Sequence, residues 1–173
     1  PDYTFALNAG FDWKGLTFSM MLQGVQGAQA AYMAKYTLFS DGDGNFNRGK
    51  DILNAWTPEN TASYIPRLTR NDDNKNFTTP STWYLEDASY IRLKNVTFGY
   101  TIPQKITRKA SIDKIRAYVS LENFLTFDNL RGLPIDPECV TGKSMWGSNY
   151  AQGNTGFNTP VFKTISAGLQ VTF

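Results

Sequence analysis

The densest group of oxygen-bearing side chains in the 173-residue sequence lies between residues 41 and 51. Its members are Asp41, Asp43, Asn45, Asn47 and Asp51. Hard cations favour such spacing, but the EF-hand pattern is not matched. Phe46 stands where that loop needs Gly, and Ile52 stands where it needs a bidentate Glu. Asp, Gly and Asn also form solvated turns, and this second interpretation is favoured. We predict no metal site.

Two pairs of carboxylates raise the question of glycosidase chemistry. They are Glu86 with Asp87, and Asp136 with Glu138. Neighbouring residues in a strand point to opposite faces, so Glu86 and Asp87 are not expected to converge. The sequence has no His, which removes the usual general base and excludes a Ser-His-Asp triad. Cys139 is the only cysteine, which excludes an internal disulfide and a Cys-based metal site. We predict neither catalysis nor a cofactor.

Aromatic residues are frequent in the segments that lack periodicity. Their rings are able to stack on sugars or pack against a partner, while Asn and Asp bond hydroxyl groups. The alternative is that most of them form small cores inside long loops. The candidates for ligand or partner contact are Trp56, Tyr64, Trp83, Tyr84, Trp146 and Tyr150.

The elements that must position these loops alternate strictly between apolar and polar residues. In residues 164–173 the apolar positions are Ile165, Ala167, Leu169, Val171 and Phe173. This period of two predicts a strand with one apolar face. An edge strand of a soluble sandwich is one interpretation. The last strand of an outer-membrane β-barrel, with one face in lipid and an aromatic at the interface, is the other.

Five segments follow the same rule and predict an all-β, antiparallel fold. The expected strands are 3–13, 16–24, 88–102, 114–127 and 164–173. Short turns at 14–15 and 103–113, the second of them basic, alternate with long loops at 27–82 and 128–160. The strand lengths suit a tilted membrane crossing, which needs about 9–11 residues. Arg116 and Glu122 fall opposite the apolar residues of their strand, as a lumen-facing position requires.

One strand changes the parity of its apolar residues. Ile91 and Leu93 are out of step with Val96 and Phe98. Either a bulge near Lys94–Asn95 shifts the register, or the first half of this strand stands above the bilayer.

Membrane-barrel edges cannot lie open in lipid, and the smallest bacterial barrels have about eight strands. We therefore expect a piece of a larger barrel; the start at Pro1, without a Met or a signal peptide, fits a mature chain or a piece. The short turns would be periplasmic, where Trp13, Tyr100 and Phe173 form an aromatic girdle. Leu169, Val171 and Phe173 resemble the terminal signal read by the barrel-assembly machinery. Outer-membrane lipid is then a partner.

Charge and hydropathy exclude two other classes of protein. The net charge is +2, and the basic residues do not form a stripe, so nucleic-acid binding is not expected. No apolar run approaches the ~18 residues of a transmembrane helix.

Several sequence blocks resemble the C-terminal part of SusC/RagA-type TonB-dependent outer-membrane transporters. The most specific block is 85–103, LEDASYIRLKNVTFGYTIP, and the others are 54–61, 65–67, 115–127, 136–138 and 168–173. The resemblance implies that residues 1–173 are the last five strands of a transmembrane barrel of about 22, with two long extracellular loops. It also implies an N-terminal plug, a TonB-contacting segment outside this chain, and a SusD-like surface lipoprotein.

The function expected from this resemblance is import of oligosaccharides or peptides into the periplasm. Two alternatives stay open on the residues alone. One is a soluble β-sandwich that binds carbohydrate through loop aromatics, and the other is a passive porin.

Overall fold

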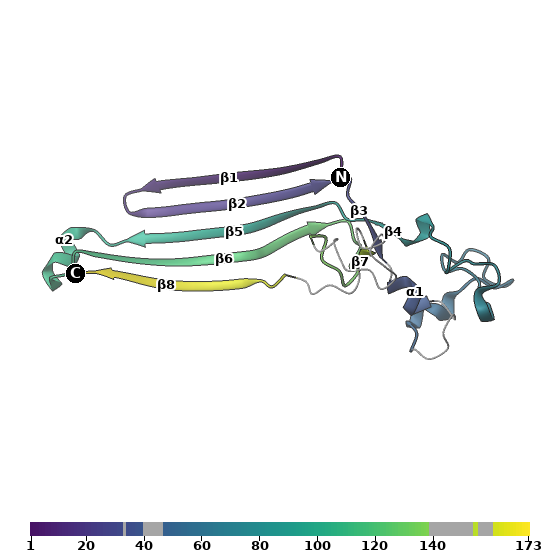
Figure 1. Cartoon of the computed structure of the whole chain (residues 1–173). Helices are drawn as coiled ribbons and strands as arrows, with labels where there is room; N and C mark the ends of the chain where they lie inside the picture. Colours follow the sequence, from purple (N-terminus) through teal and green to yellow (C-terminus); the bar gives the residue numbers. More distant parts are fainter. Residues whose placement is uncertain (33, 40–46, 139–153, 156–160) are drawn as a thin grey trace. The chain divides into compact units, whose positions relative to one another are not determined.

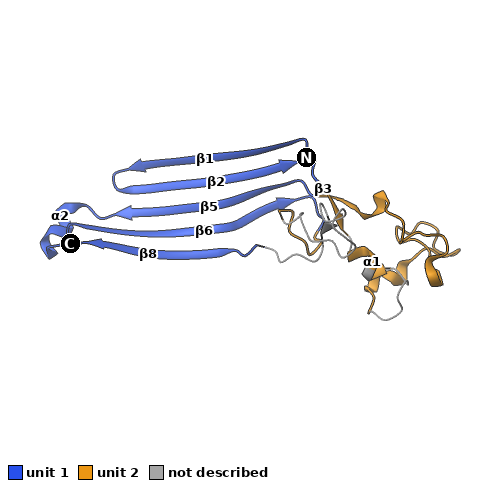
Figure 2. Ribbon diagram, in the orientation of Figure 1, with its two compact units in different colours: residues 1–28, 88–131, 160–173 blue, residues 29–87, 132–159 orange. Residues whose placement is uncertain are grey.

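A computed structural model describes residues 1–32, 34–39, 47–138, 154–155 and 161–173 (Figure 1). The chain divides into two compact units (Figure 2). Unit 1 comprises Pro1–Ala28, Ala88–Arg131 and Pro160–Phe173, and unit 2 comprises Gln29–Asp87 and Gly132–Thr159. No helix of the described residues is long and apolar enough to cross a membrane.

Unit 1 is built on one five-stranded antiparallel sheet in the order β1-β2-β5-β6-β8. Figure 1 shows these strands lying side by side. Their bounds are β1 (Tyr3–Trp13), β2 (Leu16–Gln26), β5 (Tyr90–Thr101), β6 (Lys114–Asp128) and β8 (Thr164–Thr172). All five strands predicted from the alternating pattern are confirmed, with boundaries shifted by one or two residues at some ends.

The register places like residues on like faces across the whole sheet. Directly opposite residues of neighbouring strands project from the same face. One row therefore runs Phe11, Phe18, Phe98, Val119 and Ala167, and the next parallel row runs Ala9, Met20, Val96, Leu121 and Ile165. The rings of Phe18 and Phe98 lie 5.0 Å apart between centroids. One face of the sheet is consequently apolar from β1 to β8.

The change of parity in β5 is a bulge. Met21 pairs with Asn95 while the next residue of β2, Leu22, pairs with Leu93, so Lys94 is an extra residue in β5. On the other side Asn95 pairs with Glu122 and Leu93 with Leu125, so β6 has two residues beside Lys94. Leu93 and Val96 therefore lie on the same apolar face. Of the two explanations open from sequence, the register supports the bulge.

The turns of unit 1 follow from their residues. Lys14 and Gly15 both have positive φ, 47° and 88°, which is the type I′ geometry that joins twisted antiparallel strands with two residues. Between β5 and β6, Pro103 precedes two short helical elements, α2 (Gln104–Thr107) and η4 (Arg108–Ala110). Ser111 then reverses the chain with a φ of 57°.

Unit 2 contains regular structure that the sequence did not reveal. Residues 27–82 were expected to be a loop without periodicity, yet β3 (Gln29–Tyr32) pairs antiparallel with β4 (Leu85–Asp87) and parallel with β7 (Asn154–Thr155). This expectation was wrong because strands this short do not display a measurable period. The remaining elements of the unit are α1 (Ala34–Phe39), η1 (Lys50–Asn54), η2 (Arg70–Asp72) and η3 (Thr82–Tyr84). Its buried apolar residues include Ala30, Tyr32, Ala55, Ile65, Phe77 and Tyr84.

Candidate functional site

The apolar face of the five-stranded sheet is exposed. Leu7 on β1 is 52% exposed, Phe98 on β5 is 48% exposed and Leu169 on β8 is 68% exposed. A second sheet packed on this face, as in a sandwich, would bury such residues. No described part of the chain does so. The face is therefore a large, continuous apolar surface that calls for a partner.

The opposite face of the same sheet is polar and linked by hydrogen bonds across strands. Arg116 on β6 donates from Nη2 to Thr17 Oγ1 on β2, at 3.1 Å, and so spans β5. It passes over Gly99, where a Cβ atom would lie 3.0 Å from Nη2. Asn95 donates to Ser120 Oγ at 3.0 Å. Glu122 is paired with Asn95 and shares this face with Arg116, as predicted.

The residues assigned to an aromatic girdle gather at the turn end of the sheet. Trp13 and Tyr100 both pair with Leu16, so they lie in one row, and they are 62% and 47% exposed. Phe173 follows the last residue of β8 at the same end. Leu169 and Val171, the other two residues of the assembly-signal prediction, lie on the apolar face opposite Ala117 and Ile115.

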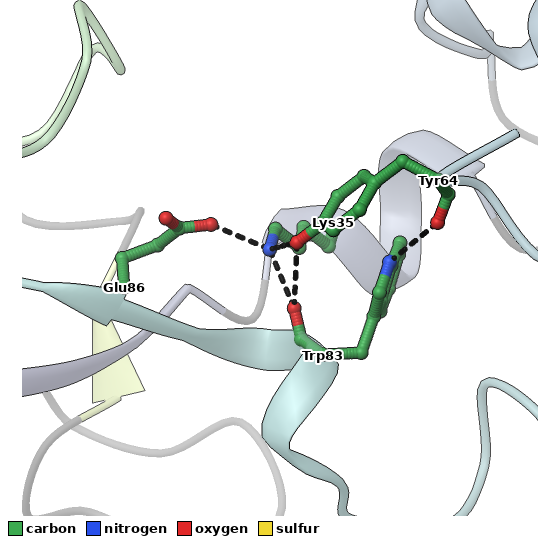
Figure 3. Close-up of polar contacts among 4 residues, drawn as sticks. All are labelled: Lys35, Tyr64, Trp83 and Glu86. Atoms are coloured by element: carbon green, nitrogen blue, oxygen red, sulfur yellow. Dashed lines mark hydrogen bonds and ion pairs between the residues drawn. The ribbon is translucent and has the colours of Figure 1, made fainter.

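A buried lysine organises unit 2. Lys35 of α1 is 4% exposed, and its Nζ lies 2.5 Å from Glu86 Oε1 of β4 (Figure 3). The same Nζ donates to Trp83 O at 2.5 Å and to Tyr64 Oη at 3.0 Å. It also stands 4.9 Å from the centroid of the Trp83 ring. A buried cation needs such compensation, because its loss of hydration is otherwise unfavourable by several kcal/mol.

Trp83 is the centre of an aromatic core in this unit. The rings of Phe39, Tyr64, Phe77 and Tyr84 lie between 4.9 and 6.1 Å from it, measured between centroids. Its Nε1 donates to Tyr64 O at 3.1 Å. Tyr84 is buried and donates its hydroxyl to Phe77 O at 2.5 Å. Burial, followed by the nearby Tyr36 and Asp72, raises the pKa of Tyr84 to about 12.

The predicted loop aromatics are thus divided by the structure. Tyr64, Trp83 and Tyr84 belong to one cluster, in which Tyr64 is 66% exposed. Trp56 is half-buried, and the Arg67 guanidinium lies 6.0 Å from its ring centroid. Trp146 and Tyr150 lie outside the described residues.

Asp72 is a second buried charged residue that the sequence analysis missed. Its carboxylate accepts hydrogen bonds from the backbone N–H groups of Asn76, Phe77 and Thr78, and from Thr78 Oγ1. Burial acts to raise the pKa of Asp72, but the bonds from Phe77, Thr78 and Asn76 outweigh it and hold the pKa below its usual value. The Asn-Asp-Asp-Asn run at 71–74 was a signal for an Asx-type turn of this kind. Lys35 had no such signal, because lysine is ordinarily exposed.

The acidic groups considered for chemistry stand as follows. Glu86 and Asp87 are adjacent in β4, and Glu86 is engaged by Lys35. Asp136 is buried and accepts a hydrogen bond from the backbone N–H of Glu138. Asp41, Asp43 and Asn45 lie outside the described residues. Among those that are described, no three His, Cys, Asp or Glu residues are grouped to hold a metal ion.

Comparison with known proteins places this architecture. No family model matches the chain. It is 32% identical to "TonB-dependent receptor P3" of Formosa agariphila, over 100% of this chain and 16% of the receptor. It is 33% identical to "TonB-dependent receptor P26" of the same organism, over 100% of this chain and 17% of the receptor.

Solved structures give the same result. The RagAB peptide transporter matches with a TM-score of 0.68 and 31% identity, over 98% of this chain and 17% of that chain. The RagAB peptide importer in the "open-open" state matches with a TM-score of 0.73 and 30% identity, over the same shares. The chain therefore spans about one sixth of the length of these relatives, which are named receptors and transporters.

Proposed function

Because this chain is related along its whole length to SusC/RagA-type TonB-dependent receptors, we propose that it forms the C-terminal part of the barrel wall of an outer-membrane importer. In this assignment the long strands cross the outer membrane, and residues 27–82 and 128–160 are extracellular loops. The observation that carries the proposal is the apolar face that runs without interruption from β1 to β8 and is exposed.

The edges of the sheet support a larger barrel. In the described sheet β1 and β8 each have a neighbour on one side only. An unpaired ladder group in hydrocarbon is unfavourable by several kcal/mol, so both edges require further strands. Those strands would come from the rest of a barrel of about 22.

The ends of the sheet give its orientation. The tight Lys14–Gly15 turn and the α2–η4 turn lie at one end, and short turns are periplasmic in bacterial barrels. Trp13, Tyr100 and Phe173 then form the periplasmic aromatic girdle. Leu169, Val171 and Phe173 serve as the assembly signal of the last strand.

The partners follow from the same assignment. The polar face, with Arg116 and Glu122, would look into the lumen toward an N-terminal plug. TonB would act through a segment outside this chain, and a SusD-like lipoprotein would cover the extracellular loops. The substrate is an oligosaccharide or a peptide; the structural relative is a peptide transporter. Of the four described candidate aromatics, Tyr64 is the one most open to a ligand.

Spin labels on adjacent residues test the membrane assignment. Leu7 and Asn8 are neighbours in β1 that project from opposite faces. In the intact protein without other cysteines, Leu7→Cys and Asn8→Cys are labelled with nitroxides in outer-membrane vesicles. The label at residue 7 should be relaxed by oxygen, which concentrates in lipid, and the label at residue 8 by a water-soluble nickel chelate. Equal access of the nickel chelate to both labels would contradict the proposal.

Uptake assays separate active import from a passive pore. Cells that carry the intact protein should accumulate a fluorescent oligosaccharide or oligopeptide only while TonB is present and the inner membrane is energised. Uptake that is indifferent to both would support a porin instead. A protein that stays soluble and monomeric without detergent would support the carbohydrate-binding sandwich.

A further inference from the structure

A groove of about 520 Å³ interrupts the apolar face near its turn end. Larger side chains of four strands surround it, from Leu16, Phe98, Tyr100, Val119 and Leu169. Two alanines lower the surface between them: Ala117 lies in the row between Tyr100 and Leu169, and Ala167 lies beside Val119. The groove thus offers a narrow apolar channel on a face that is otherwise covered by large side chains.

Basic residues lie beyond the end of this groove. Lys14 and Lys114 line a second, polar pocket at the turn end, together with Gly15, Thr101 and Gln104. Lys14 Nζ also stands 5.0 Å from the centroid of Trp13, on the apolar face. The α2–η4 turn adds three more exposed cations, Lys105, Arg108 and Lys109.

These cations have no anionic partner within the described part of the chain. The ion pair found there joins Lys35 to Glu86 in unit 2. Asp113, the acidic member of the polar pocket, instead accepts a hydrogen bond from Gln104 at 2.9 Å. The turn end therefore presents unneutralised positive charge next to an apolar groove.

We propose that the turn end of the sheet binds one anionic phospholipid, with its phosphate at Lys14 and Lys114 and one acyl chain in the groove over Ala117. The dimensions agree: Ala117 lies three residues along β6 from Lys114, about 10 Å at the rise of a strand. A headgroup phosphate at the interface and an acyl chain below it have this arrangement. The proposal rests on the membrane orientation given above, which puts this end in the inner leaflet.

The combination favours a lipid over a free phosphate ion. Lysines at a membrane surface attract anionic lipids, and the groove supplies an apolar surface that inorganic phosphate does not use. A zwitterionic lipid would gain the groove without the full attraction of the lysines. The site should therefore prefer phosphatidylglycerol to phosphatidylcholine, and salt should weaken this preference.

Photo-crosslinking in nanodiscs measures the preference at this place. The intact protein is reconstituted with phosphatidylglycerol that carries a diazirine on one acyl chain, or with the matching phosphatidylcholine. Crosslinked residues are located by mass spectrometry. We expect crosslinks within 115–119 and 165–171, with a higher yield for phosphatidylglycerol. Equal yields from the two lipids would overturn the proposal.

Two variants assign the parts of the site. The double variant Lys14→Gln/Lys114→Gln should reduce the phosphatidylglycerol yield by about fivefold for each lysine, since each contributes about 1 kcal/mol near an anionic surface. Ala117→Leu fills the groove and should lower the yield for both lipids. An excess of glycerophosphoglycerol, the headgroup without chains, should leave the crosslinks unchanged, and full competition by it would contradict a lipid site.

Matched controls keep the result specific. Lys163→Gln removes an exposed lysine at the other end of the sheet, and Ala9→Leu enlarges an alanine of the apolar face on β1; neither should matter. A loss with Lys163→Gln equal to that of the double variant would reduce the effect to net charge. The nitroxide labels at residues 7 and 8 separate the two proposals. If residue 7 lies in lipid and the lipids crosslink equally, only the lipid site is wrong.

Discussion

The ring of Tyr118 on β6 lies over Gly168, its cross-strand partner on β8. A Cβ atom built on Gly168 would stand 2.4 Å from Tyr118 Cζ and 2.5 Å from its Oη. Phe5 covers Gly24 in the same way between β1 and β2, on the apolar face. An aromatic ring placed over a glycine covers backbone that the missing side chain leaves bare, and it fixes the register of the two strands.

Gly168→Ala should therefore destabilise the intact protein by about 1–3 kcal/mol, the usual effect of overpacking. Urea unfolding in lipid vesicles measures the change. In a Tyr118→Ala background the same substitution should be nearly neutral, because the ring that it displaces is absent. A Gly168→Ala penalty of the same size in both backgrounds would show that the strand itself, and not the ring, rejects the methyl group.

Glu86→Gln should loosen unit 2. It leaves the buried ammonium of Lys35 without a counter-charge, while the bonds to Trp83 O and Tyr64 Oη remain. We expect a local loss of about 2–3 kcal/mol. Amide hydrogen exchange within 29–39 and 83–87 should then accelerate roughly 30- to 150-fold.

Glu59→Gln, at an exposed glutamate of the same unit, is the matched control and should leave exchange unchanged. The paired variant Lys35→Met/Glu86→Leu removes both charges and should be far milder than Glu86→Gln alone. If the paired variant is the more damaging of the two, the packing of these side chains matters more than their charges.

Asp72 should make the 70–78 segment sensitive to acid. Because its folded pKa is lowered, the ionised form stabilises the fold, and this stabilisation is complete above the ordinary Asp pKa of about 3.9. It is lost as the pH falls from there through the lowered value. Hydrogen exchange of residues 76–78 should rise over that interval and not at neutral pH.

Asp72→Asn should remove this acid dependence and raise exchange at all pH values, since an amide nitrogen replaces one accepting oxygen. Asp73→Asn, at the exposed neighbouring carboxylate, should preserve the wild-type profile. An unchanged acid profile in Asp72→Asn would assign the effect to another group.

Phe173 should matter more for assembly than for stability. Its replacement by a charged residue should sharply lower the amount of protein in the outer membrane, whereas a charge near the interface of a folded barrel changes stability by only about 0–1 kcal/mol. Gln170, on the polar face of the same strand, should tolerate substitution. Immunoblots of outer-membrane fractions provide the measurement. Equal, near-normal amounts for the two variants would leave Phe173 without a role as a signal.

The five long strands were predictable because alternation over nine or more residues is a strong local signal. The register across strands was not, since it depends on pairing between segments far apart in sequence. Lys94 shows the difference: from sequence, the parity change beside it had two explanations, and the pairing of Leu93 with Leu22 decides between them.

Unit 2 was beyond reach for a related reason. Lys35 and Trp83 are 48 residues apart, and neither belongs to a periodic segment. The sequence identified Trp83 and Tyr84 as loop aromatics and left open whether they bind ligands or form a core. It had no means of finding the buried cation at their centre, because burial of a lysine depends on partners that only the folded chain assembles.

The bulge at Lys94 has a consequence for how such strands change length during evolution. A single inserted residue normally exchanges the two faces of a strand for the rest of its course. Here the strands gain residues step by step at one level, none in β2, one in β5 and two in β6, and the faces stay the same on either side. That level is a place where insertions and deletions are silent with respect to what each face contacts. An alignment of related strands should accordingly place its gaps there, opposite Lys94 and Asn123, before the alternating pattern is compared.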